Sequence, residues 1–238
     1  MKIKLSLQYF IAFFTLVFLV HEIHDWAHVL VARAFCGCWG TRAFDSWTPC
    51  VSCLHGGRGV IPATIAGPAV NYIIIWWGLA LMFPEEPPQR QSLGFSLIMA
   101  ALPLPRILGA CSGGGDETST MRQLFQHPGG SNPYIVAAAG LLIVLLLNIP
   151  ALVRIFFLMP KWWGKLLVLP AFLVIPPMVD HWLVSVELNK LLAEGMFSRL
   201  IMRGVPQAIV FWLFFLIVIF LLTCRSLVSF FDYAEFEF

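Results

Sequence analysis

Charged residues are scarce in this sequence. Lys, Arg, Asp and Glu make up only 12% of the 238 residues, and the formal net charge is +2. Soluble domains carry about twice that share of charged residues, roughly 25%, so an ordinary soluble domain is excluded. The chain also lacks a basic tract, and we therefore expect no nucleic-acid partner. Hydrophobic residues make up 59% of the chain, which predicts a protein embedded in a lipid bilayer.

A signal-peptide cleavage site is missing as well. No small-x-small motif follows the first apolar run, so we interpret that run as a retained span. A bilayer core of about 30 Å needs roughly 20 apolar helical residues, and six stretches qualify. They are residues 5–35, 60–83, 92–110, 134–158, 163–186 and 206–231.

These spans predict a single all-α domain over residues 1–238, with about six transmembrane helices and a Cys-rich loop after the first. Prolines are expected to break several of them, at Pro103 and Pro105 in the third and at Pro170 and Pro176-Pro177 in the fifth. Such breaks are tolerated where the backbone is buried in protein or lines a cavity. We expect a multi-pass protein of a prokaryotic cell membrane.

Basic residues do not decide the orientation of the spans. Lys2 and Lys4 favour a cytoplasmic N-terminus, but Arg33, Arg42 and Arg58 then fall in an external loop. Basic residues are usually enriched in cytoplasmic loops. Here the N-terminal lysines fit that rule, but the three arginines of the next loop do not.

Cysteines are few, and four of the six crowd one short loop. Cys36 and Cys38 form a C-x-C pair, and Cys50 and Cys53 form a C-x2-C pair. Four thiolates suit a structural zinc site, and two disulfides suit an oxidising compartment. Unpaired thiols are the third interpretation, and the spacing alone leaves all three open.

Five ionisable side chains stand within eight residues of the first span: His21, Glu22, His24, Asp25 and His28. Ionisable groups are costly in lipid and indicate a functional site. Residues four apart on a helix share a face, so His24 and His28 can bind one metal ion. A carboxylate beside the first histidine, here Asp25, is placed as a general base. A hydrogen-bonded polar cluster without metal is the alternative.

Two segments carry a resemblance to a known family. The run HDWAHVLVARAFCG over residues 24–37 resembles the signature of the site-2 protease family of intramembrane zinc metalloproteases, with Asp25 where the family has Glu. The run IAGPAVNY over residues 65–72 is similar to the family's Ala-Gly-Pro-x-x-Asn segment. The resemblance implies zinc held by His24 and His28. It also implies that Gly67, Pro68 and Asn71 shape the cavity, with Asn71 as a hydrogen-bond donor to the substrate or oxyanion.

The third motif of that family departs from the pattern here. Family members supply the last metal ligand from an Asp in Asn-x-x-Pro-x-x-x-Leu-Asp-Gly, but the aligned residue is Leu108. Asp116 follows three glycines that let the backbone turn back, so we predict it as the third ligand. The alternative is that Asp116 caps a short helix over residues 118–126. Other candidate ligands or supporting groups are His21, Glu117, Asp180 and His181, and Glu22 is a second candidate base.

The leading prediction is an intramembrane zinc metalloprotease that cleaves a transmembrane or membrane-proximal protein substrate. Asp at the base position and Leu108 at the ligand position favour an alternative, a relative without activity that binds or scaffolds membrane proteins. A membrane di-iron oxygenase is a third possibility, because His21, His24 and His28 are spaced like a histidine box. Such enzymes need around eight histidines, and this chain has six.

Overall fold

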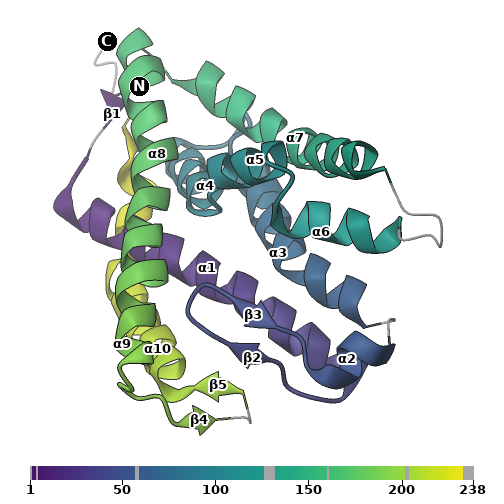
Figure 1. Cartoon of the computed structure of the whole chain (residues 1–238). Coiled ribbons are helices and arrows are strands. Elements are labelled where there is room, and N and C mark those ends of the chain that lie inside the picture. The colour runs from purple at the N-terminus through teal and green to yellow at the C-terminus, as the bar shows by residue number, and fades with distance from the viewer. Residues whose placement is uncertain are drawn as a thin grey trace, which may run out of the picture.

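The computed structural model describes residues 2–3, 5–56, 59–125, 132–159, 161–201 and 204–232. Figure 1 shows how its elements are arranged. They are β1 (Lys2–Ile3), α1 (Leu7–Cys36), β2 (Thr41–Arg42), β3 (Trp47–Thr48), α2 (Val51–Gly56), α3 (Val60–Ala80), α4 (Pro88–Ala100), α5 (Pro103–Cys111), α6 (Gly115–Leu124), α7 (Pro133–Leu158), η1 (Gly164–Val168), α8 (Leu169–Asp180), η2 (His181–Leu188), α9 (Asn189–Ala193), β4 (Leu200–Ile201), β5 (Val205–Pro206), α10 (Gln207–Thr223), η3 (Cys224–Ser229) and β6 (Phe231–Asp232).

Six helical segments in this part of the chain are long and apolar enough to cross a membrane. They are Leu7–Cys36, Val60–Ala80, Pro88–Cys111, Pro133–Leu158, Gly164–Ala193 and Gln207–Ser229. The predicted all-α fold with six spans is therefore confirmed. The three sheets are two-stranded hairpins or pairs outside these segments.

Helix α1 packs against several other elements of the fold, including α3, α4, α8 and α10. The Ser6 side chain accepts a hydrogen bond from the Tyr9 N–H and starts the helix. Gly37, with φ of 73°, ends it by donating its N–H to the Arg33 carbonyl. No Gly or Pro lies between them, so the helix carries the ionisable cluster unbroken through its second half.

The third span breaks before Pro103, as predicted, but not at Pro105, which lies within α5. Leu102 takes a left-handed conformation, with φ of 53°, between α4 and α5. Pro103 disfavours helical geometry at the residue before it, and a proline has no N–H to donate.

The fifth span differs from the expectation of a break at its prolines. Pro176 and Pro177 lie inside α8, and the helix continues through the π-helical segments η1 and η2. The wider π turns accommodate local mismatches in backbone hydrogen bonding without ending the helix. Asp180, the last residue of α8, is buried at the junction with η2.

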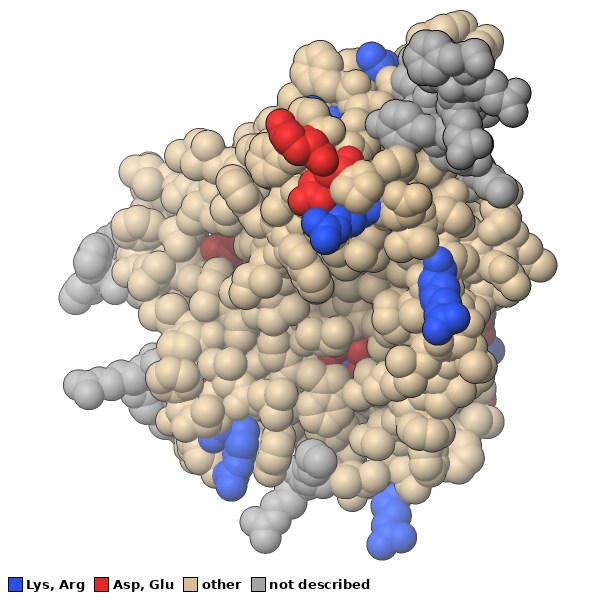
Figure 2. Space-filling model, turned by 180° about the vertical axis from the view of Figure 1, so that it is seen from behind, with Lys and Arg blue, Asp and Glu red and all other residues tan. Residues whose placement is uncertain are grey.

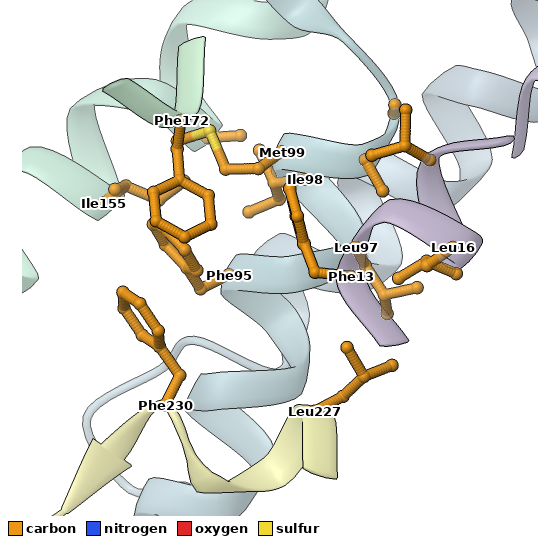
Figure 3. Packing of buried hydrophobic residues seen from close by; sticks show 14 of the residues in the cluster. Phe13, Leu16, Phe95, Leu97, Ile98, Met99, Ile155, Phe172, Leu227 and Phe230 are labelled. Atoms are coloured by element: carbon orange, nitrogen blue, oxygen red, sulfur yellow. The ribbon is translucent and has the colours of Figure 1, made fainter. Parts of the chain in front are cut away.

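An aromatic core fixes α1, α4 and α8 together. Phe95 stacks on Phe230 with ring centroids 4.3 Å apart, and Phe13 meets Phe172 edge to face at 4.9 Å (Figure 3). Aromatic pairs in such arrangements add to the free energy of burial. The outer surface is different: the face that Figure 2 shows is mostly uncharged, with scattered Lys and Arg side chains and one group of acidic side chains beside a basic one. An apolar exterior of this kind suits a lipid environment.

The structure resolves the state of the four loop cysteines as two disulfides. Cys36 pairs with Cys53, and Cys38 pairs with Cys50. Stable disulfides form in oxidising compartments, so this loop is expected to face away from the cytoplasm. Arg42 in the same loop has a fully buried side chain paired with Glu22, so it does not count as a free basic residue for orientation.

Labelling tests this orientation. In a Cys111→Ser/Cys224→Ser background, an impermeant reductant followed by an impermeant maleimide is expected to label the loop cysteines in intact cells. A cysteine introduced by Glu85→Cys, in the exposed turn between α3 and α4, should react only after permeabilisation, because one span separates the two loops. The reverse pattern would place the disulfide loop in the cytoplasm.

Candidate metal centre

Three side chains from two helices converge in the second half of α1. His24 Nε2 and His28 Nε2 lie 3.1 Å apart. Asp116 Oδ2 lies 3.3 Å from His24 Nε2 and 3.4 Å from His28 Nε2. A tetrahedral metal ion with bonds of about 2.0–2.1 Å needs ligand atoms about 3.3 Å apart. The three atoms therefore have the mutual spacing of metal ligands.

Asp116 reaches this position because α6 turns back onto α3 and α7. Gly113 and Gly115 have φ of 74° and 84°, which glycine adopts without steric cost. The residue before α6 is Gly114, and no side chain caps the helix, so the interpretation of Asp116 as a helix cap is contradicted. Burial raises the pKa of the Asp116 carboxyl, but hydrogen bonds with the His24 and His28 rings lower it by more, so that the pKa lies below its ordinary value.

His28 has the partners of a metal ligand. Its Nδ1 donates to the Ala63 carbonyl at 2.6 Å, which leaves the lone pair of Nε2 free. The ring is buried and stacks on Trp47, with centroids 4.7 Å apart and planes 13° from parallel. Both contacts hold the ring in one orientation.

His24 has a different partner. Arg106 Nη2 lies 2.9 Å from His24 Nδ1, and a guanidinium only donates hydrogen bonds. His24 Nδ1 is therefore the acceptor, and the proton of the neutral ring lies on Nε2. Coordination through Nε2 requires that proton to move to Nδ1, so Arg106 must turn away from the ring when a metal ion binds.

Other groups can hold Arg106 after such a turn. Arg106 Nη1 donates to Glu117 Oε1 at 3.0 Å, and the Tyr72 hydroxyl donates to the same oxygen. With its amide oxygen toward Arg106, Asn71 accepts from Nε at 3.1 Å and from Nη2 at 2.6 Å. Glu117 is thus a buried counter-ion of Arg106, and Asn71 contacts Arg106.

Glycine at position 67 is what lets α3 pass against the two histidine rings. A Cβ atom at Gly67 would lie 2.3 Å from His28 Nε2 and 2.6 Å from His24 Cε1. Any side chain at this position would therefore collide with the Nε2 atom of His28 and with the His24 ring. Pro68, the next residue, is buried within α3.

Asp25 lies beside the three converging atoms. One of its oxygens is within 4.8 Å of ring nitrogens of His24 and His28. Two ligands of one zinc-sized ion lie at most about 4.2 Å apart, and Asp116 is closer to both rings. Asp116 is therefore the better placed candidate for a third ligand, and Asp25 lies next to it.

Arg42 and His21 surround the Asp25 carboxylate. Arg42 Nη2 lies 2.7 Å from Glu22 Oε2 and 3.4 Å from Asp25 Oδ2. His21 Nε2 lies 3.7 Å from Asp25 Oδ2, while its Nδ1 contacts both oxygens of Asp180 at 3.0 and 2.8 Å. Glu22 and Asp180 therefore have ion-pair partners of their own and do not join the three converging atoms.

A polar pocket of about 190 Å³ opens onto this region. His21, His24, Asp25, Asn71, Arg106 and Asp180 are among the residues that line it. One predicted candidate lies elsewhere: His181 is exposed at the start of η2. Leu108, which stands where the related motif has its ligand, is exposed on α5.

Four residues of this region were not singled out from the sequence as site residues: Arg42, Trp47, Tyr72 and Arg106. Arg106 carries a usable signal, because a basic residue inside an apolar span needs a partner in the protein. Arg42 and Trp47 carry none, because a loop sequence does not reveal which helix the loop covers.

Comparison with known proteins brings no further assignment. No family model, no curated protein and no solved structure matches the chain.

Proposed function

We propose that this protein is an intramembrane metalloprotease that uses zinc to hydrolyse a peptide bond in or near the bilayer. The observation that supports this most is the convergence of His24, His28 and Asp116 at separations of 3.1–3.4 Å. Two histidines and one carboxylate form a common ligand set of catalytic zinc, which leaves a fourth position open. The family resemblance of residues 24–37 and 65–72 supports the same assignment.

Each residue has a definite role in this proposal. Bound zinc supplies Lewis acidity, which polarises a carbonyl group and makes a water molecule more acidic. Asp25 accepts one proton of the attacking water, whose oxygen bonds to the carbonyl carbon. The carbon–nitrogen bond then breaks, and the proton passes to the leaving amine. His21, oriented by Asp180 and next to Asp25, offers a second position for that proton.

A second candidate function is favoured by one observation. Arg106 donates to His24 Nδ1, which holds the ring in the tautomer that cannot bind a metal ion through Nε2. In a relative without activity, the cluster would be a network of hydrogen bonds inside a membrane binding or scaffold protein. The two candidates differ in one measurable property, the affinity for zinc.

Metal binding by purified protein decides between them. Zinc is expected to bind one per chain, and Asp116→Ala should weaken binding by roughly a hundredfold. Zinc-finger peptides gain about 10–16 kcal/mol from four ligands, so losing one ligand costs about 3 kcal/mol. Zinc-loaded wild-type protein should cleave a transmembrane peptide, and the Asp116→Ala variant should not at the same zinc concentration.

A matched control is Leu108→Ala, because Leu108 occupies the ligand position of the related motif but is exposed. This variant should bind zinc as the wild type does. Wild-type protein that binds no zinc would support the scaffold function. Two iron ions per chain would support the oxygenase alternative.

A further inference from the structure

The hairpin β2–β3 is closed at its base by a disulfide. The hairpin spans residues 41–48, and the Cys38–Cys50 disulfide joins the segments on either side of it. The Cys36–Cys53 disulfide lies just outside and fastens the loop to the C-terminal end of α1. Figure 1 shows the hairpin running alongside the second half of α1, the half that carries the ionisable cluster.

Arg42 projects from this hairpin into the protein. Its side chain is fully buried, and its Nη2 contacts the carboxylates of Glu22 and Asp25. The guanidinium also lies over the Trp26 ring, 5.2 Å from the centroid. A buried guanidinium between two carboxylates restricts both of them, because each loses a charged partner if it moves.

Trp47 is the residue paired with Arg42 across the hairpin, and its ring stacks on His28. The two paired residues thus contact two different parts of the centre: Arg42 touches the proposed base, and Trp47 touches a proposed ligand. No other loop in the described part of the chain is placed by hydrogen bonds or ring contacts on both Asp25 and His28.

The far side of the hairpin is also held. The Arg42 N–H donates to the Gly204 carbonyl at 3.1 Å, and Asn189 Oδ1 accepts from the Phe44 N–H at 2.9 Å. A Cβ atom at Gly204 would lie 2.1 Å from the Gly40 carbonyl oxygen, so the two backbones are in close contact. The hairpin therefore sits between the connector after α9 and the centre on α1.

We propose that the disulfide-closed hairpin is a positioning element of the metal centre: Arg42 aims Asp25, and Trp47 fixes the His28 ring. This inference rests on the proposed function, because it takes the cluster of His24, His28 and Asp116 to be a metal-binding centre. It adds that the Cys38–Cys50 disulfide, which lies in the loop and touches none of the ligands, sets the geometry of metal binding.

Cobalt(II) binding tests the proposal without requiring catalysis, because the visible spectrum of bound cobalt reports the ligand geometry. The Cys38→Ser/Cys50→Ser variant is expected to bind cobalt about tenfold more weakly and with an altered spectrum. Losing a group that orients a ligand typically costs 10–100-fold in affinity. The matched control is Cys111→Ser/Cys224→Ser, because both of these cysteines are free, and it should match the wild type.

Two further variants separate positioning from folding. Trp47→Ala should weaken cobalt binding about tenfold and change the spectrum, whereas Trp47→Phe, which keeps a stacking ring, should restore both. Variants that fold like the wild type by circular dichroism and still give the wild-type affinity and spectrum would overturn the proposal.

Cleavage assays on the same samples distinguish this proposal from the proposed function. Wild-type protein that binds cobalt and zinc but cleaves nothing defeats only the protease function, and the cobalt results still decide the role of the hairpin. Wild-type protein that binds neither metal defeats both.

Discussion

Asp25→Asn is expected to lower the rate of peptide hydrolysis by roughly a thousandfold while zinc affinity stays close to that of the wild type. A general base commonly contributes about 10²–10⁴-fold to a rate, and an amide cannot accept the proton. Metal affinity is retained because the three converging ligand atoms belong to His24, His28 and Asp116. The measurement is kcat for a transmembrane peptide together with zinc content.

Two controls accompany this variant. Glu85→Gln changes an exposed carboxylate in the turn between α3 and α4, outside the pocket, and it should leave kcat within about twofold, because a surface substitution rarely has a large effect. Asp25→Glu keeps a carboxylate on a longer side chain and should retain measurable activity. If Asp25→Asn cleaves as fast as the wild type, another group is the base, and Glu22 or His21 becomes the candidate to test.

Gly67→Ala is expected to weaken zinc binding about a thousandfold or more. The added Cβ atom would lie 2.3 Å from His28 Nε2 and 2.8 Å from His24 Nδ1. The His28 ring cannot move aside freely, because it is held by Ala63 and Trp47. The methyl group therefore displaces the ligand nitrogens from their shared position.

Gly109→Ala provides the matched control for this substitution. Gly109 also lies within a membrane-spanning helical segment, but a Cβ atom there meets nothing within 4 Å. Alanine is favoured over glycine within a helix by about 1 kcal/mol, so both variants gain the same helix propensity. Isothermal titration with zinc should show a loss for Gly67→Ala alone. Equal affinities for both variants would mean that zinc does not bind at the His28 nitrogen that Gly67 faces.

The spans were predictable from the sequence because lipid imposes a simple requirement. A segment of about 20 apolar residues must satisfy its own backbone hydrogen bonds, and a helix does so locally. The pairing of His24 and His28 followed from the same local geometry, since helical residues four apart share a face. The break before Pro103 was likewise predictable, because proline has no N–H to donate and disfavours helical geometry at the residue before it. None of these features depends on distant parts of the chain.

The partners of the cluster were harder to predict. Asp116 was one of several candidate acids, and Asp180 was another. The structure brings Asp116 to both ligand histidines and Asp180 to His21. The choice depends on how α6 and α8 pack on α1 and α3, because only packing decides which of two acids of equal chemistry comes within hydrogen-bond distance.

The sequence by itself therefore determined a six-span membrane protein with a pair of histidines on one helical face, because both properties arise from local periodicity. Tertiary structure alone decided that Asp116 lies beside the ring nitrogens of His24 and His28 and that Arg106 contacts His24. It also decided that Arg42 and Trp47 reach the centre from a loop closed by disulfides. These contacts join residues far apart in the chain, and their distances are set by how the helices pack.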